Sequence, residues 1–265
     1  MLLINMIGLG TYKLDNDTTF NIVQEALKLG YRIIDTAQLY ENEESVGKAI
    51  RESQIDRNEI FVITKIWLTN IEQGKQSIIN SVINSLNKLD IGYIDALLLH
   101  GPVKDKIIES WIVMQDIFLD KIDELKGKIK SIGVSNYDIP DLEILLENCD
   151  IVPAHNQIEI SPFCKRQQLI EYCKSKNIEI IAHSSLTKGK MFNHMAIQQL
   201  CSKYNCKPSK ILLNWSLSKG YIVLPRTSNL NHLKENFDHN LILNKRDISM
   251  LDTINEIFYT HPQYA

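Results

Sequence analysis

Residues 30–50 of the chain read GYRIIDTAQLYENEESVGKAI. The apolar run at residues 31–34 is short and β-rich, which favours a buried strand. Gly30 precedes this run, at a place where a helix would take its C-terminal cap. Asp35 follows the run directly, and Tyr40 lies in the loop beyond it. The block therefore predicts a helix end, a buried strand and a loop that carries polar side chains.

The same alternation of apolar runs and helical segments extends over the whole chain. Apolar runs lie at residues 7–10, 31–34, 60–64, 94–99, 129–135, 152–157, 178–182 and 221–225. The segments between them have helical periodicity, most clearly residues 76–89, where the apolar side chains form one stripe. Eight strand–helix units predict an α/β fold: a single (β/α)8 TIM barrel with its active site at the C-terminal ends of the strands.

A doubly wound sheet is the competing architecture. It needs a glycine-rich phosphate-binding turn after the first strand, and the sequence GLGT at residues 8–11 lacks the GxGxxG spacing. The length of 265 residues, with 44% hydrophobic residues, suits one barrel of about 250 residues. We therefore expect residues 1–265 to form a single barrel domain.

Charge and cysteine usage argue against several classes of function. The chain has 29 basic and 32 acidic residues, and no run of like charge indicates a nucleic-acid surface. No stretch reaches the ~20 apolar residues that a bilayer span needs, and the first residues lack a signal-peptide pattern. The five cysteines have neither paired nor metal-ligand spacing. We expect a cytoplasmic protein with reduced thiols and without a metal, a membrane or a nucleic-acid partner.

Two further helix starts have sequence signals. Pro208 suits the first turn of a helix that begins near Ser209. Asn244 and Asp247 resemble a capping box before the last helix, in which each side chain would bond to the other residue's backbone.

Polar side chains stand at or just after the ends of the predicted strands. In chain order they are Asp35, Lys65, His100, Ser135, Asn136, Gln157, Ser184 and Arg226. Because the carboxyl ends of barrel strands share one face, we expect these groups to converge on one cavity. Each residue alone is equally typical of a cap, an ion pair or a solvated loop; their succession indicates an active site.

Three of these polar residues, and the tyrosine in the loop after the second strand, have chemistries that fit together. Asp35 and Lys65 belong to neighbouring strands, so a plain buried ion pair is one interpretation. The other adds Tyr40, because a nearby ammonium lowers the pKa of a phenol, about 10 in water, and suits it to general-acid catalysis. His100 ends the apolar run DALLLH, where burial favours a neutral ring that donates one hydrogen bond. Considered alone, Tyr40 would be interpreted as an amphipathic residue at the rim of the site. Considered alone, His100 would be interpreted as a core residue with its hydrogen bonds satisfied.

Ordered sequence blocks carry a family resemblance. They are GLGTYKL from Gly8, the block at residues 30–50, ITK ending at Lys65, YIDALLLH ending at His100, IGVSNY around Gly133, NQIEISP from Asn156 and LPRTSNLNHLKEN from Leu224. Together they resemble the aldo-keto reductase superfamily over nearly the whole chain. The resemblance implies reduction of aldehyde or ketone carbonyls with NADPH as hydride donor.

The resemblance also implies a catalytic tetrad of Asp35, Tyr40, Lys65 and His100. In it, Tyr40 protonates the substrate oxygen and Lys65 lowers the pKa of Tyr40. Asp35 keeps Lys65 charged, and His100 orients the carbonyl. The substrate is expected to contact Tyr12, Tyr40 and His100.

Cofactor contacts are implied by the same resemblance. Ser135, Asn136 and Gln157 would hold the nicotinamide carboxamide, and residues 184–188 would lie near the pyrophosphate. Arg226 and Thr227 would hold the 2′-phosphate, which favours NADP(H) because a guanidinium is a charged, multiple donor. Glu235 and Asn236 would reach the adenine. The full expected set is Gly10, Thr11, Asp35, Ser135, Asn136, Gln157, His183, Ser184, Ser185, Leu186, Lys188, Arg226, Thr227, Ser228, His232, Glu235 and Asn236.

Several positions depart from the family pattern. His183 stands in place of a tyrosine that stacks on nicotinamide, and His232 in place of an arginine beside the 2′-phosphate. Loss of that guanidinium removes a charged hydrogen bond of about 1.5–3 kcal/mol, so NAD(H) stays an alternative cofactor. Ser185 and Thr187 replace a proline and a glycine in the pyrophosphate loop.

The substrate pocket departs as well. Tyr12 and Gly101 replace two frequent tryptophans, which predicts a less aromatic mouth and loose selectivity for aldehydes, sugars or α-dicarbonyls. Two other functions stay open. One is a catalytically silent NADP(H)-binding regulatory subunit of a larger complex, and the other is a barrel isomerase or lyase with Lys65 as Schiff base. We expect a monomer with a small carbonyl compound as its partner.

Overall fold

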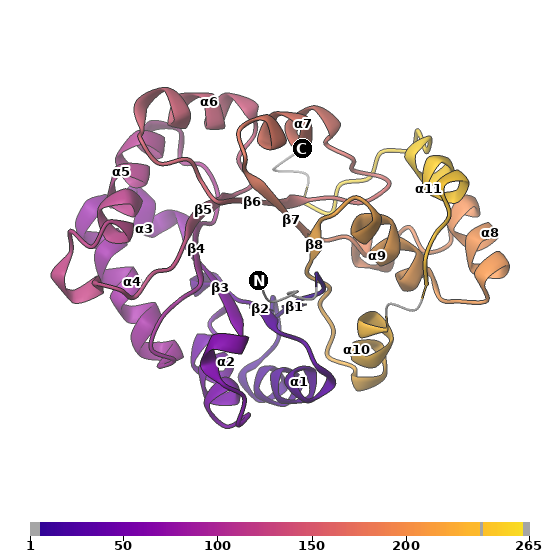
Figure 1. Cartoon of the computed structure of the whole chain (residues 1–265), viewed down its shortest axis with the longest axis horizontal. Coiled ribbons are helices and arrows are strands. Elements are labelled where there is room, and N and C mark those ends of the chain that lie inside the picture. The colour runs from indigo at the N-terminus through magenta and orange to yellow at the C-terminus, as the bar shows by residue number, and fades with distance from the viewer. Residues whose placement is uncertain (1–5, 239–240, 262–265) are drawn as a thin grey trace.

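The computed structural model describes residues 6–238 and 241–261, and it contains one parallel sheet with strand order β1 to β8 (Figure 1). The strands are β1 Leu9–Gly10, β2 Ile33–Asp35, β3 Phe61–Ile66, β4 Ala96–Leu99, β5 Ile132–Ser135, β6 His155–Glu159, β7 Glu179–His183 and β8 Ile222–Val223. Parallel bridges from Ile7 to Val223 and from Gly10 to Arg226 join the last strand to the first. The predicted closed (β/α)8 barrel is confirmed.

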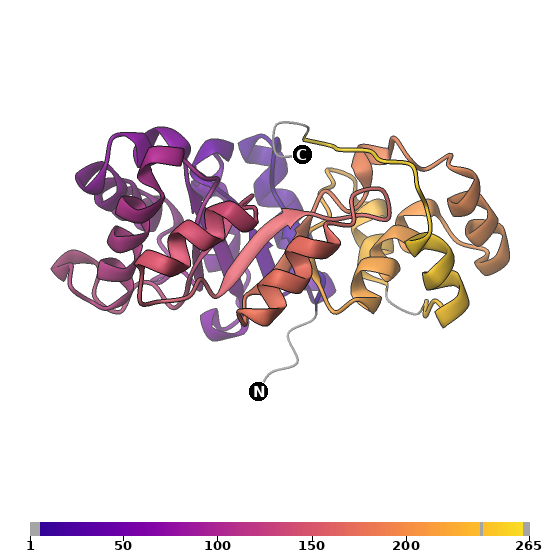
Figure 2. The same cartoon turned by 90° about the horizontal axis from the view of Figure 1, so that it is seen from above.

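Helices surround the barrel on the outside (Figures 1 and 2). They are α1 Asn16–Leu29, α2 Glu43–Arg51, α3 Leu68–Glu72, α4 Lys75–Leu89, α5 Ile107–Phe118, α6 Ile139–Asn148, α7 Gln167–Ser175, α8 Met195–Tyr204, α9 Pro208–Ser218, α10 Leu230–Phe237 and α11 Lys245–Asp252. In the described ranges, no helix combines the length and the apolar character that crossing a membrane requires.

The predicted helix boundaries are largely confirmed. Gly30 caps α1 with a left-handed φ of 105°, and Pro208 opens α9. Asn244 caps α11 by accepting the backbone N–H of Asp247. The predicted reciprocal hydrogen bond of the capping box is wrong. The Asp247 carboxylate accepts hydrogen bonds from Lys203 and Tyr204 of α8, and not from the Asn244 backbone N–H.

Side chains alternate between the inside of the barrel and the layer between strands and helices. The interior cluster consists of Ile33, Ile63, Ala96, Leu98, Ile181 and Leu224. Their chain neighbours, such as Ile34, Val62 and Leu97, belong to the larger outer core. Because side chains at i and i+2 share one face of a strand, the residues two positions beyond the interior cluster point inward above it. Asp35, Lys65 and His100 occupy such positions.

Several strands continue further than the sequence indicates. Asp35 is the last residue of β2, Lys65 lies inside β3, and His183 ends β7, although each was expected after a strand or in a loop. The backbone of such a residue can stay in the strand ladder because its side chain is satisfied inside the barrel. Asp35 and Lys65, for example, pair with each other there.

Close packing of α2 against α4 depends on one glycine. A Cβ atom built on Gly47 would lie 1.8 Å from the carbonyl oxygen of Leu89, far inside contact distance. Arg51, one turn further along α2, donates from Nη1 to the same carbonyl at 2.7 Å. This contact fixes the helix that follows the Tyr40 loop and so helps to fix the loop itself.

Candidate active site

The four predicted catalytic residues meet at the carboxyl ends of β2, β3 and β4. Lys65 Nζ lies 2.6 Å from Asp35 Oδ1 and 3.4 Å from Tyr40 Oη. The Tyr40 and His100 rings are 5.7 Å apart between centroids and nearly perpendicular. The acid, ammonium, phenol and imidazole therefore form one contiguous cluster.

The Lys65 ammonium is oriented by its three hydrogen bonds. They go to Asp35 Oδ1, to the Thr36 carbonyl oxygen at 2.9 Å and to Tyr40 Oη, which matches the three donors of an ammonium. Burial lowers the pKa of Lys65 below the usual lysine range, and the Asp35 carboxylate opposes that shift. Gln157 Nε2 also donates to Asp35 Oδ1, at 2.8 Å. The cluster thus places a paired ammonium directly beside the phenol.

His100 is buried and neutral. Burial lowers the pKa of His100 to about 2, and the positive charge of Lys65 acts in the same direction. Nδ1 of the ring has no hydrogen-bond partner among the described residues. The Trp67 ring lies 5.0 Å away, edge to face. A neutral imidazole in this setting can donate a hydrogen bond to a ligand oxygen.

Tyr40 is held by the short 3-10 helix Gln38–Tyr40 and by side chains on both sides of it. Gln38 Nε2 donates to Ser85 Oγ of α4 at 3.0 Å. The buried Asn42 donates from Nδ2 to the Thr11 carbonyl oxygen at 2.9 Å, which ties the Tyr40 loop to the loop after β1. Both anchors are polar residues that the sequence interpretation did not single out.

The residues expected at the nicotinamide carboxamide form the next layer of the site. Ser135 Oγ and the Asn136 backbone N–H both donate to the Gln157 carbonyl oxygen at 2.9 Å. Asn136 has a left-handed φ of 59°, and its Nδ2 donates to the His100 carbonyl oxygen at 2.9 Å. Its Oδ1 lies 3.0 Å from His183 Nε2. These contacts connect β5, β6 and β7 to the catalytic cluster.

The loop after β7 carries the residues expected near the pyrophosphate. His183 Nδ1 lies 3.0 Å from Ser184 Oγ, so both ring nitrogens are engaged and the ring is fixed. Burial lowers the pKa of His183 to about 3. Ser184 and Lys188 have left-handed φ values of 57° and 49°. The buried Ser185 Oγ has no hydrogen-bond partner among the described residues.

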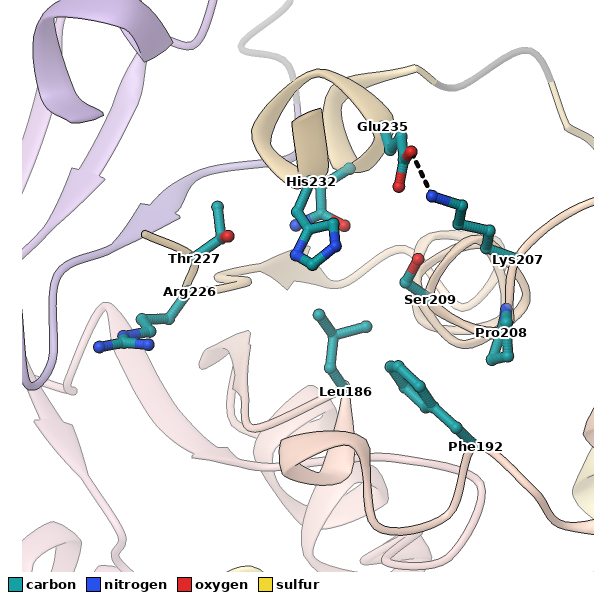
Figure 3. Close-up of a pocket in the computed structure, with 10 residues that line it drawn as sticks. Leu186, Phe192, Lys207, Pro208, Ser209, Arg226, Thr227, His232 and Glu235 are labelled. Atoms are coloured by element: carbon teal, nitrogen blue, oxygen red, sulfur yellow. Dashed lines mark hydrogen bonds and ion pairs between the residues drawn. The ribbon is translucent and has the colours of Figure 1, made fainter. Parts of the chain in front are cut away.

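A cavity of about 210 Å³ lies between α9 and α10 and the loop after β7 (Figure 3). We call it the α9/α10 pocket. Its lining residues are Leu186, Phe192, Lys207, Pro208, Ser209, Arg226, Thr227, His232, Glu235 and Asn236. The structure thus gathers the predicted residues Leu186, Arg226, Thr227, His232, Glu235 and Asn236 around one space. It adds Phe192, Lys207, Pro208 and Ser209, which the sequence interpretation missed.

Other expected cofactor residues lie outside this pocket. Gly10 bridges to Arg226, and Thr11 is buried with its Oγ1 donating to the Asp35 carbonyl oxygen at 3.0 Å. Ser228 is exposed. The Arg226 guanidinium is turned towards the β1 loop, where it donates to the carbonyl oxygens of residues 12 and 13 at 3.0 and 2.6 Å.

The segment after α11 runs over one end of the barrel (Figure 2). The buried Glu159 carboxylate at the end of β6 accepts the backbone N–H groups of Thr260 and His261 at 2.6 and 3.0 Å. The His261 ring is thereby placed 5.8 Å from the His183 ring and 6.4 Å from the Tyr12 ring. His261 is therefore part of the wall of the site.

Comparison with known proteins agrees with this geometry. A family model described as the Aldo/keto reductase family matches residues 6–256. The chain belongs to the aldo/keto reductase family. The reductase is 35% identical to glyoxal reductase of Bacillus subtilis over 251 residues, which cover 94% of this chain and 88% of that protein. It is 35% identical to the methylglyoxal reductase DkgA of Escherichia coli over 236 residues, 88% of this chain and 82% of that one.

Solved structures of the family superpose closely on this aldo/keto reductase. An aldo-keto reductase from a Medee basin deep-sea metagenome library has a TM-score of 0.88 and 32% identity, covering 96% of this chain and 94% of that one. A variant of the protein Gox0644, solved in complex with NADPH, has a TM-score of 0.85 and 33% identity, covering 93% and 88%. The expected family and fold are both confirmed, and family membership makes the chain an oxidoreductase.

Two ring residues at the mouth of this reductase were absent from the predicted set. Trp67 follows β3 by one residue and packs on His100. His261 reaches the site from the far end of the chain through Glu159. Trp67 could have been found as a large aromatic residue just beyond a strand end. His261 had no comparable signal, because its place depends on a contact that spans 102 residues. With Tyr12 and His183, these rings make the mouth richer in aromatic surface than expected.

Proposed function

We propose that this aldo/keto reductase reduces small aldehyde and ketone carbonyls to alcohols with NADPH, and that Tyr40 is the general acid. The observation that carries the proposal is the 3.4 Å contact of Tyr40 Oη with Lys65 Nζ, which also pairs with the buried Asp35 carboxylate. An adjacent ammonium stabilises the phenolate that remains once a tyrosine has given up its proton.

The residues of the site divide the reaction between them. NADPH, when bound, supplies a hydride from nicotinamide C4 to the carbonyl carbon. Tyr40 gives its phenolic proton to the carbonyl oxygen, and the alcohol is complete. Lys65 stabilises the resulting phenolate, and Asp35 keeps Lys65 charged against the effect of burial. The neutral His100 ring donates a hydrogen bond that orients the carbonyl, and solvent restores the Tyr40 proton.

The described residues fit a dinucleotide with a 2′-phosphate. The buried Ser185 hydroxyl has no partner within the described chain, and the α9/α10 pocket is open beside Arg226 and Thr227. Ser135, Asn136 and Gln157 would hold the carboxamide end above the catalytic cluster. Residues 184–188 would contact the pyrophosphate, while Glu235 and Asn236 would contact the adenine. The α9/α10 pocket would then receive the adenosine end.

Small dicarbonyl and aldehyde substrates suit the mouth of the site. The ring of Tyr12 lies 5.0 Å from that of Tyr40, and Trp67 and His261 close other sides. Two relatives are named for reduction of glyoxal and methylglyoxal, compounds with two adjacent carbonyls. We infer the same substrate class here, with simple aldehydes and open-chain sugars as further candidates. A monomer in the cytoplasm is the expected form of the enzyme.

Cofactor titration followed by turnover tests the proposal. NADPH and NADH are titrated against the intrinsic tryptophan and tyrosine fluorescence, and cofactor oxidation is then followed with glyoxal, methylglyoxal and a bulky planar ketone. We expect NADPH to bind more tightly than NADH and the dicarbonyls to turn over. Binding without turnover of any carbonyl would instead identify a silent regulatory subunit. Absence of nucleotide binding would favour the Schiff-base lyase.

A further inference from the structure

One lysine of the α9/α10 pocket has no place in the reaction described above. Lys207 immediately precedes α9, and its Nζ lies 2.5 Å from Glu235 Oε1 of α10 (Figure 3). We infer that Lys207 is a cofactor-specificity residue, which supplies the positive charge that lets this pocket accept a 2′-phosphorylated adenosine. The inference rests on the proposed NADPH dependence and names the residue that sets it.

The position of Arg226 creates the need for a second cation. Two of its nitrogens donate to the carbonyl oxygens of Tyr12 and Lys13. Figure 3 shows its guanidinium pointing away from His232 and Glu235. His232 is cationic only when protonated. Lys207 is therefore the permanent cation that stands on the Glu235 side of the pocket.

The charge balance of the lining depends on Lys207. The Arg226 guanidinium is turned to the carbonyl oxygens of Tyr12 and Lys13, so the Lys207 ammonium is the cation that balances the Glu235 carboxylate of the lining. Without Lys207, the Glu235 carboxylate faces the pocket without its partner. A phosphate monoester brings about −1.5 to −2 charges, so an uncompensated carboxylate would repel it. An adenosine without the 2′-phosphate meets no such repulsion.

The Lys207–Glu235 pair matters for ligand placement more than for stability. The Lys207 and Glu235 side chains are 64% and 36% exposed, and exposed pairs contribute little to folding. An ammonium has three donors, and among the described residues Lys207 Nζ is hydrogen-bonded to Glu235 alone. The remaining donors are available to an anionic ligand in the pocket while the side chain is held by Glu235.

A neighbouring ion pair provides a matched control. Lys210 lies one turn further along α9, and its Nζ lies 2.6 Å from Asp238 Oδ2, just after α10. This pair also joins α9 to the end of α10, but neither residue lines the pocket. Loss of Lys210 removes the same charge and a similar contact between the same elements, away from the proposed phosphate.

The test compares ligands that differ by the 2′-phosphate. Dissociation constants of NADPH and NADH, and of 2′,5′-ADP and 5′-AMP, are measured for the full chain and for Lys207→Gln, Lys207→Arg and Lys210→Gln. We expect Lys207→Gln to weaken NADPH and 2′,5′-ADP about tenfold, the loss of one charged hydrogen bond, and to change NADH and 5′-AMP less than about twofold. Lys207→Arg should keep the preference, and Lys210→Gln should leave all four constants within about twofold.

The outcomes separate the inference from the proposed function. If the unaltered chain binds NADPH but Lys207→Gln weakens the phosphorylated and unphosphorylated ligands equally, or changes neither, Lys207 does not set cofactor specificity. If the unaltered chain binds neither dinucleotide, the proposed reductase function fails, and the inference fails with it. An equal loss from Lys210→Gln would also overturn the inference, because it would show a general effect of net charge.

Discussion

Gln157 Nε2 and Lys65 Nζ donate to the same oxygen of Asp35, at 2.8 and 2.6 Å. Gln157 lies on β6 and Asp35 on β2, and their positions in the chain differ by 122. A residue expected to hold the carboxamide of the cofactor therefore also hydrogen-bonds the carboxylate that pairs with the catalytic lysine. One oxygen atom therefore links the proposed cofactor contact of Gln157 to the proposed proton-transfer group.

Gln157→Leu should therefore lower turnover as well as cofactor affinity. Loss of its hydrogen bond to a charged group weakens the hold on Asp35, and we expect kcat to fall about tenfold while the Kd of NADPH rises. Steady-state kinetics and fluorescence titration measure the two effects. Ser135→Ala is the control, since Ser135 bonds to the Gln157 backbone but not to Asp35. A rise in Kd with unchanged kcat would show that the shared oxygen has no kinetic role.

Tyr40→Phe should abolish turnover while cofactor binding persists. Removal of the general acid is expected to lower kcat about 10²- to 10⁴-fold and to leave the Kd of NADPH within about twofold. Tyr12→Phe is the matched control, because its ring packs 5.0 Å from that of Tyr40 and lies outside the Lys65 hydrogen bonds. Equal turnover in the Tyr40 and Tyr12 variants would remove Tyr40 from the role of acid.

Two neutral histidines, His100 and His183, should make the fold sensitive to acid. The pKa of His100 is lowered to about 2 and that of His183 to about 3, both mainly by burial, against about 6.5 in an unfolded chain. The unfolded state thus binds more protons below pH 6.5. Above pH 6.5 these histidines are neutral in both states and do not lower the free energy of unfolding. Below pH 6.5 the free energy of unfolding decreases as the pH falls towards 3 and then 2.

Urea unfolding at pH 7, 6 and 5 measures this effect. For each of these two histidines, the free energy of unfolding can fall by up to about 1.4 kcal/mol per pH unit below 6.5. In His100→Gln, the free energy of unfolding should depend less steeply on pH, because about one proton fewer is taken up on unfolding. An unchanged slope in that variant would mean that His100 is protonated in the folded enzyme.

Glu159→Gln should loosen the segment that carries His261. A glutamine offers one acceptor and places an N–H₂ group against the two backbone N–H groups that the carboxylate now accepts. We expect a several-fold higher KM for methylglyoxal, an unchanged Kd for NADPH and a loss of about 1–3 kcal/mol in unfolding free energy. Glu179→Gln is the control, since Glu179 starts β7 and pairs with His155. A KM equal to that of the parent enzyme would place His261 outside the substrate site.

The sequence predicted the clustering of Asp35, Tyr40, Lys65 and His100, because three of these residues obey a local rule. Asp35, Lys65 and His100 each stand two positions beyond an interior apolar residue, so alternation alone directs them into the barrel. The strand ends were less well predicted, because a charged residue was taken to end its strand. Burying a charged side chain inside the barrel costs free energy. The ion pair between Asp35 and Lys65 offsets this cost, so both residues can stay in their strands.

Contacts between distant segments could not be predicted in the same way. The direction of the Arg226 side chain is set by carbonyl oxygens more than 200 residues earlier in the chain. The place of His261 is set by Glu159, and the Lys207–Glu235 pair forms only when α9 and α10 lie side by side. No periodicity or local motif predicts such pairs, because each pair forms only when the barrel has closed.

The order of the site residues along the ring also has an evolutionary consequence. Asp35, Tyr40, Lys65 and His100 come from the first half of the chain, whereas the proposed nucleotide contacts from Ser135 to Asn236 come mainly from the second. Recombination between two such genes at a point between α5 and β5 would join the proposed catalytic residues of one parent to the proposed nucleotide-binding residues of the other. The cofactor preference of a family member could then change while its catalytic residues stay the same.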